Sequence, residues 1–263
     1  MCTLSIIPND GQLIVTMNRD ERRDRPESGE MHVTRDAAYP SDAGTGGTWF
    51  GFNRHGLILA VLNRYDVPQR DSTLSRGRFI PALLSASNIE EAMEKFTALH
   101  SKGDNPFELV LMSKGRILHV QWDGQRVERK NHDAKIPFFL TSSSEYTATA
   151  IPLRQKLFNE FLQSHPVNGR DATAILRDLH LSGAAGQENL SIFMQRESKH
   201  TKSITQAVLS SDGVAATYYP ERQLATMAAQ GIGLSKIPAL KTHFRFQKPP
   251  GTSLKKGPRI GPH

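Results

Sequence analysis

The chain has 263 residues, of which 38% are hydrophobic and 22% charged, a composition typical of a globular protein with a substantial core. Its length fits one large domain or two small ones. Cys2 is the only cysteine, which excludes an intramolecular disulfide and a cysteine-based zinc site and favours a reducing compartment. The first residues form no long apolar run, so we expect no signal peptide, no membrane anchor and a cytoplasmic location.

The net charge of +7 is concentrated at the C-terminal end. No acidic residue follows Glu221, whereas these basic residues do: Arg222, Lys236, Lys241, Arg245, Lys248, Lys255, Lys256 and Arg259. We therefore expect a nearly neutral folded domain over residues 1–227 and a basic tail, rich in proline and glycine and largely disordered, over residues 228–263. A nucleic-acid-binding domain would carry a basic face on its ordered part, so we expect no nucleic-acid partner.

The chain begins with a predicted β-hairpin. Residues 3–7 and 12–17 are apolar, β-branched runs, and Pro8-Asn9-Asp10-Gly11 separates them. An Asp-Gly pair between two such runs is a strong hairpin signal. The hairpin would end at Asn18-Arg19-Asp20-Glu21, and its open end would bring Asp20 back beside Cys2.

A glycine-rich stretch, residues 43–49, precedes the next clear strand. A phosphate-binding loop would instead follow a strand, open a helix and continue with Gly-Lys-Ser/Thr. We interpret these glycines as a tight turn or as a close approach of the backbone to the site.

The rest of the chain alternates between strand-like and helical stretches. In chain order we expect strands over residues 32–34, 48–53 and 57–62, helices over 75–86 and 88–100, strands over 108–112, 117–122 and 138–141, helices over 151–163 and 171–181, and strands over 190–194, 204–209 and 214–219. Asn88 is the expected N-cap of the second helix. Hairpins interrupted by pairs of helices favour an α+β fold of antiparallel sheets with helices packed outside.

Cys2 has a chemical interpretation and a structural one. Removal of Met1 would make it the N-terminal residue, with a thiol and an α-amine of pKa about 7.7–8.0 on the same residue. That amine, through one water, is then a base for the thiol, as in enzymes that pair a nucleophile with an N-terminal amine. The structural alternative is that a lone cysteine is a small buried hydrophobe.

Several motifs resemble the transport-and-Golgi-organisation-2 family, also called the NRDE family. They are Met1-Cys2-Thr3-Leu4, Asn18-Arg19-Asp20-Glu21, Arg25-Pro26, Gly46-Gly47-Thr48-Trp49-Phe50-Gly51, Ala60-Val61-Leu62-Asn63-Arg64 and Ser75-Arg76-Gly77. Weaker similarity continues to Tyr219. The family in turn resembles the cysteine N-terminal nucleophile hydrolases, such as bile-salt and penicillin V acylases. That resemblance implies a four-layer αββα sandwich.

The resemblance also implies roles for individual residues. Cys2 corresponds to the nucleophile, Asp20 to the carboxylate that orients the α-amine, and Asn63 to an oxyanion-hole donor. Weaker candidates for binding are Asn18, Arg19, Ser142 and Lys202. Ser142 follows Leu140-Thr141 where the hydrolases have asparagine, and the late cationic residue of the hydrolases corresponds to Arg196 or Lys202. Arg19 stands where the acylases have an apolar residue, so we expect the pocket to favour an anionic ligand.

The first functional hypothesis is hydrolysis of a small-molecule amide or acyl thioester. Its alternative is that Asp20 is a hairpin-end carboxylate paired with a neighbouring arginine and that Asn63 caps a turn. The second hypothesis is a carrier for haem, or for acyl-coenzyme A and lipids, which the resemblance also implies. The scattered histidines form no evident metal or haem pair, although one axial histidine or the Cys2 thiolate remains as a haem ligand. We expect no required cofactor.

Overall fold

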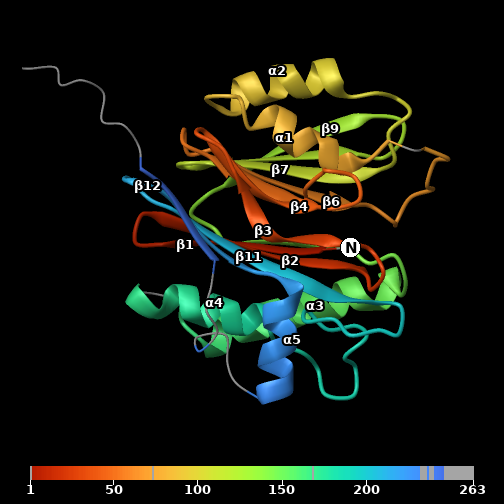
Figure 1. The fold of residues 1–263 in the computed structure, drawn as a ribbon, viewed down its shortest axis with the longest axis vertical. Coiled ribbons are helices and arrows are strands. Elements are labelled where there is room, and N and C mark those ends of the chain that lie inside the picture. Colours follow the sequence, from red (N-terminus) through yellow and green to blue (C-terminus); the bar gives the residue numbers. More distant parts are fainter. Residues whose placement is uncertain (1, 73, 168, 232–235, 237–239, 246–263) are drawn as a thin grey trace, which may run out of the picture.

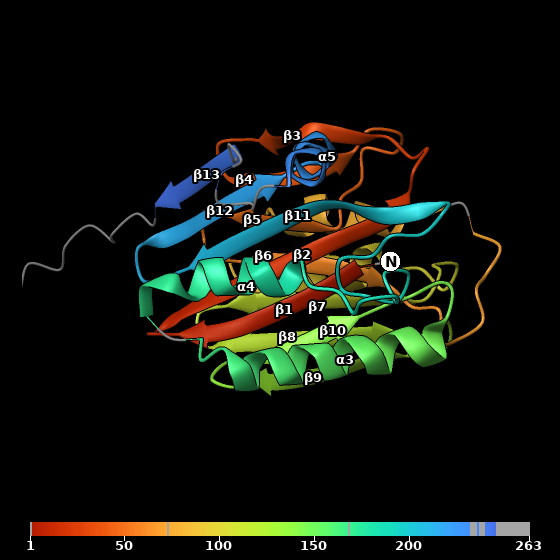
Figure 2. The same cartoon turned by 90° about the horizontal axis from the view of Figure 1, so that it is seen from below.

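The computed structural model describes residues 2–72, 74–167, 169–231, 236 and 240–245. Within these residues the strands form two antiparallel sheets, stacked face to face with helices on both outer surfaces (Figures 1 and 2). This arrangement confirms the predicted α+β fold and the αββα order of layers.

Six strands form one sheet and seven form the other. The six-stranded sheet has the order β10 (Phe138–Thr141), β1 (Cys2–Asn9), β2 (Gln12–Arg22), β11 (Lys199–Leu209), β12 (Gly213–Tyr219) and β13 (Leu240–Arg245). The seven-stranded sheet has the order β3 (Glu27–Val33), β4 (Ala37–Asp42), β5 (Phe50–Asn53), β6 (Ile58–Asn63), β7 (Phe107–Ser113), β8 (Arg116–Trp122) and β9 (Val127–Asp133).

Helices cover the outer face of each sheet. The seven-stranded sheet carries the short 3-10 turn η1 (Arg76–Arg78), α1 (Phe79–Leu83) and α2 (Ile89–Leu99). The six-stranded sheet carries α3 (Thr147–Ser164), η2 (Gly169–Asp171), α4 (Ala172–His180) and α5 (Glu221–Gln230). Asn88 caps α2 as predicted, because its side chain accepts a hydrogen bond from Glu91 N.

Because side chains alternate along β1 and β2, the two strands contribute residues to two different hydrophobic cores. Leu4, Ile6, Val15 and Met17 face the seven-stranded sheet and belong to the core between the sheets. Their neighbours Ile7 and Ile14 face the opposite way and pack against α3 and α4. Both faces of this hairpin are therefore buried, which fixes its register because a slip of one residue would exchange the two faces.

The first hairpin has the two-residue turn that the sequence predicts. Asp10 and Gly11 both have positive φ, 47° and 75°, and Asn9 pairs with Gln12. Positive φ at both turn residues matches the right-handed twist of the flanking strands. Counting back from this turn places Cys2 directly opposite Arg19, so local turn chemistry sets the register at the far end of the hairpin.

Some sequence predictions are wrong. Residues 190–194 form a turn followed by bends instead of the predicted strand, and the sequence patterns predict none of β4, β9, α5 and β13. The expected domain boundary at residue 227 falls inside α5, and β13 pairs with β12. The short, basic β13 joins the sheet because Leu240 and Phe244 pack against the core between the sheets. The predicted disorder of residues 246–263 lies outside the described residues. None of the described helices is long and apolar enough to cross a membrane.

Candidate functional site

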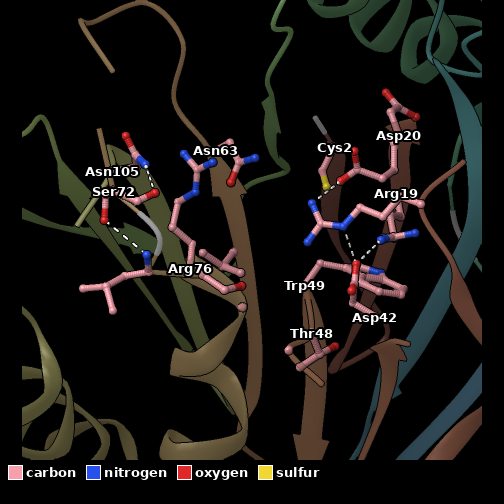
Figure 3. A pocket seen from close by; sticks show the side chains of 17 residues that line it. Cys2, Arg19, Asp20, Asp42, Thr48, Trp49, Asn63, Ser72, Arg76 and Asn105 are labelled. Atoms are coloured by element: carbon pink, nitrogen blue, oxygen red, sulfur yellow. Dashed lines mark hydrogen bonds and ion pairs between the residues drawn. The ribbon is translucent and has the colours of Figure 1, made fainter. Parts of the chain in front are cut away.

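A cavity of about 160 Å³ opens beside the N-terminal end of β1, between the ends of the two sheets (Figure 3). The ends of β1 and β2 form one wall, and the end of β6 with the segment leading into η1 forms the opposite wall. Cys2 and Asn63, which the sequence reasoning placed together, both line this cavity, and so does Asp20.

Cys2 is the first residue of β1, and both of its peptide groups are held by the chain after β10. Cys2 N donates to Ser142 Oγ (3.2 Å), and Ser142 N donates to the carbonyl oxygen of Cys2 (2.9 Å). The side chain is 6% exposed. Burial raises the pKa of the Cys2 thiol to about 11, so the thiol is protonated at neutral pH and needs a base before it can attack.

The carboxylate of Asp20 is buried and only partly satisfied. Its Oδ1 accepts a hydrogen bond from Thr201 Oγ1 (2.7 Å). Its Oδ2 lies 3.3 Å from Nη1 of Arg154 but accepts no hydrogen bond from any described residue. A buried carboxylate oxygen without a hydrogen bond can accept one from a further donor, such as an ammonium group.

Arg154 is a site residue that the sequence reasoning missed. It lies on α3 with Ala150 and Phe158 in a buried stripe at i, i+4 and i+8, and its guanidinium donates to the hydroxyls of Thr3 (3.1 Å) and Thr141 (3.0 Å). The sequence does contain an indication of this role: Arg154 stands on the apolar face of a predicted helix, where a charged side chain is rarely buried unless it is paired.

Arg19 forms part of the cavity wall, and its charge is already neutralised. It donates to Glu27 (2.7 Å) and to Asp42 (2.8 Å), while its guanidinium lies 4.3 Å from the ring centroid of Trp49. Arg25 also pairs with Asp42, at 2.6 Å. Burial raises the pKa of Glu27. These contacts make Arg19 a fixed part of the wall and a poor partner for an anionic ligand.

Asn63 and Arg76 lie side by side on the wall opposite Cys2 (Figure 3). Nδ2 of Asn63 donates to the hydroxyl of Tyr65 (2.8 Å). An amide nitrogen carries two protons, so one N–H of Asn63 remains for an oxyanion. The expected oxyanion role of Asn63 stays a prediction, and the structure brings the residue to the right cavity.

Three of the four weaker candidates do not line the cavity: Asn18, Ser142 and Lys202. Ser142 instead holds the backbone of Cys2. Asn18 points to the outer face of β2, where its Nδ2 donates to the carbonyls of His180 (2.9 Å) and Ile192 (3.1 Å). Lys202 occupies the register shift between Thr201 and Ser203, and its Nζ pairs with Glu221 (2.8 Å).

Arg196, the other expected late cation, is not a lining residue either and donates to Ser143 Oγ (3.0 Å). The cation that reaches Asp20 is Arg154, from α3. Within the described part of the chain, no group of three or more histidine, cysteine, aspartate and glutamate residues is placed to hold a metal ion.

The layers and the strand topology give the chain the fold of the N-terminal nucleophile hydrolases. It is similar in structure to the N-acylethanolamine-hydrolysing acid amidase orthologue of Caenorhabditis elegans, with 14% identity, 79% of this chain and 92% of that chain covered, and a TM-score of 0.51. A conjugated bile acid hydrolase from Clostridium perfringens matches with 12% identity, 95% and 97% coverage, and a TM-score of 0.49.

Comparison of the sequence with models of protein families identifies the family of this chain. The model of the family described as Transport and Golgi organisation 2 matches residues 1–205, and the chain belongs to this family. No curated protein sequence matches the chain significantly.

Proposed function

We propose that the protein hydrolyses a small-molecule amide or acyl thioester, with Cys2 as an N-terminal nucleophile after removal of Met1. One observation carries the proposal: the register of the first hairpin brings Cys2 and Asp20 to the same cavity, and the buried Oδ2 of Asp20 accepts no hydrogen bond from any described residue. Ser142 Oγ already accepts the hydrogen bond of Cys2 N. Removal of Met1 turns the peptide nitrogen of Cys2 into a free α-amine with additional hydrogens. We propose that Oδ2 of Asp20 accepts one of them.

The steps follow from these groups. The α-amine of Cys2 takes the thiol proton, and Sγ attacks the carbonyl carbon of the substrate. An N–H of Asn63 stabilises the oxyanion, a contribution typically worth ~2.7–4 kcal/mol. The leaving amine or thiol takes the proton from the α-ammonium, which leaves an acyl group on Sγ. Water then attacks this thioester with the amine as base, releases the acid and restores the thiol.

Asp20 positions the amine in this mechanism. Its negative charge stabilises the α-ammonium that forms after proton transfer, and its buried pair with Arg154 holds the carboxylate in place. Ser142 holds the nitrogen from the other side. Since burial keeps the thiol protonated, acylation requires the free amine, and a chain that retains Met1 lacks this base.

Intact mass is the first test. We expect Met1 to be absent and an activated acyl ester to add one acyl group at Cys2, which then hydrolyses. A Cys2→Ala variant is the control for the site, because the chain has no other cysteine. A chain with a non-removable extension before Cys2 is the control for the amine. Retention of Met1 in the active preparation, or equal acylation of the extended chain, contradicts the proposal.

The carrier hypothesis, with haem or acyl-coenzyme A and lipids as ligand, stays a prediction. No histidine of the described residues lines the cavity, and the cavity volume of about 160 Å³ is below the ~300–1,000 Å³ usual for drug-sized ligands. Haem titration monitored by absorbance, with the Cys2→Ala variant as control, tests haem binding at this cavity. The cytoplasm remains the proposed location, on the basis of the single cysteine.

A further inference from the structure

The three arginines that line the cavity differ in their partners. Arg19 is paired with Glu27 and Asp42, and Arg25 with Asp42 and Glu21. Arg76 makes no ion pair with any described residue.

The contacts of Arg76 are with neutral acceptors. Its Nη1 donates to the carbonyl of Pro106 (3.0 Å) and lies at 3.5 Å from Oε1 of Gln69. Among the described arginines of the cavity wall, Arg76 is therefore the one whose charge no carboxylate pairs with. Burial lowers the pKa of Arg76, although the nearby Tyr65 and Glu21 act in the opposite direction.

Close packing of two backbones holds Arg76 in position. A Cβ on Gly77 would lie 2.8 Å from Thr48 N, and a Cβ on Gly47 would lie 3.1 Å from the carbonyl carbon of Gly77. Thr48 N donates to Gly77 O (3.0 Å) and locks η1 against the chain that leads to β5. Arg76, the residue before Gly77, is thereby fixed at the cavity wall, and a fixed cation is a better recognition element than a mobile one.

The groups around Arg76 suit an oxyanion. Asn63, Ser72 and Ser75 line the same part of the cavity and carry N–H or O–H groups, while the carboxylates of Asp20, Glu21 and Asp42 each have an arginine partner. Figure 3 shows Arg76 beside Asn63, facing Cys2 across the cavity. A ligand that reaches from Cys2 to Arg76 therefore meets a thiol at one end and an unpaired cation at the other.

We propose that the substrate carries a carboxylate or phosphate group that pairs with Arg76 while its acyl carbon lies at Cys2. This inference rests on the proposed function and names its substrate class: acyl compounds with an anionic group near the reacting bond. Arg76 is then the specificity-determining residue, because a neutral substrate leaves its half-buried charge uncompensated.

The test uses the single cysteine and needs no turnover. Iodoacetate and iodoacetamide are nearly the same size, and both alkylate Cys2 with loss of iodide, but only iodoacetate is an anion. Both need the same thiolate, so the ratio of their rates, followed by intact mass, is independent of the thiol pKa. We expect Arg76→Gln to lower the ratio of iodoacetate to iodoacetamide by about tenfold. Arg76→Lys keeps part of the preference.

A matched control removes the same charge elsewhere. The Arg126 side chain is 74% exposed and does not line the cavity, so Arg126→Gln leaves the ratio unchanged. Thermal unfolding shows whether each variant is folded. Equal ratios in the wild type and in folded Arg76→Gln overturn the anion site and leave the proposed hydrolase intact. No reaction of Cys2 with either reagent overturns both.

Competition identifies the anion. Acetate or inorganic phosphate is added while iodoacetamide alkylates Cys2, at constant ionic strength. Protection by acetate supports a carboxylate substrate, protection by phosphate supports a phosphate substrate, and in both cases Arg76→Gln abolishes the protection. Protection by neither, or equal protection in Arg76→Gln, contradicts the inference.

Discussion

The guanidinium of Arg154 and the carboxylate of Asp20 form an ion pair of 3.3 Å in which both side chains are completely excluded from solvent. The pair joins α3 to β2 across β1, and Arg154 also donates to the hydroxyl of Thr3 on β1. The residue proposed to position the α-amine is therefore held by a helix that follows it by more than a hundred positions in the sequence.

Removing Arg154 leaves the Asp20 carboxylate buried without its counter-charge. We expect Arg154→Met to lower the free energy of unfolding by about 3–5 kcal/mol, measured by urea denaturation. The double variant Arg154→Met, Asp20→Asn restores much of this loss, because no unpaired charge remains buried. The more exposed pair Arg54–Asp36 is the control, and Arg54→Gln costs less than ~1 kcal/mol. A loss in Arg154→Met as small as that of the control argues against a strongly coupled pair.

A second buried network gives a pH dependence of stability. Asn18 Oδ1 lies 2.8 Å from His180 Nδ1, and Ser5 Oγ lies 2.7 Å from His180 Nε2. Asn18 donates through Nδ2 to two carbonyls, so its Oδ1 accepts from Nδ1–H and the Ser5 hydroxyl donates to Nε2. The order Ser-His-Asn resembles a catalytic triad, but all three residues are fully buried and none lines the Cys2 cavity. We assign this network a structural role.

Burial lowers the pKa of His180 from 6.5 to about 3, so the folded protein keeps this ring neutral. Above pH 6.5 the ring is neutral in both states and has no effect. Below it the unfolded chain takes up a proton that the folded chain does not. We expect stability to fall by about 1.4 kcal/mol per pH unit from this group between pH 6 and pH 4. Urea denaturation at several pH values measures the slope. His180→Gln removes this component, whereas the exposed His55→Gln does not; equal slopes in all three proteins contradict the assignment.

Gly77 tests whether backbone packing positions the cavity wall. An added Cβ would lie 2.8 Å from Thr48 N and 3.0 Å from Thr48 O, and backbone atoms cannot move aside like a flexible side chain. We expect Gly77→Ala to destabilise the protein by about 1–3 kcal/mol in urea denaturation. Gly103→Ala is the matched control, since its Cβ meets only Ser101 Oγ at 3.5 Å. If Gly77→Ala left the free energy of unfolding unchanged, η1 and the segment around Thr48 could move apart without loss of stability.

Phe244 tests the end of the folded domain. It packs against the core between the sheets and makes an edge contact with Phe52, with ring centroids 5.6 Å apart. We expect Phe244→Ala to lower the free energy of unfolding by about 1–3 kcal/mol, less than for a fully buried phenylalanine. The neighbouring His243 is exposed, so His243→Ala has little effect. If the domain ended at residue 227, both substitutions would be neutral.

The sequence by itself determined the first hairpin and what depends on it. Asp10-Gly11 selects the turn, the turn sets the register, and the register places Arg19 opposite Cys2 and Asp20 at the same end. The apolar alternation and the pairs of helices likewise determined the α+β layers. These features are local, so a short window of sequence contains the information.

Only the tertiary structure decided which distant residues complete the site. Ser142 reaches Cys2 because β10 pairs with β1, Arg154 reaches Asp20 because α3 crosses the outer face of the sheet, and Arg76 reaches the cavity through the contact of Gly77 with Thr48. None of these contacts has a local signal, because each depends on how whole layers stack. The ion pairs of Arg19 with Glu27 and Asp42 likewise depend on tertiary packing. From the sequence we expected Arg19 to favour an anionic ligand, whereas packing pairs Arg19 with two carboxylates and leaves Arg76 without an ion pair among the described residues.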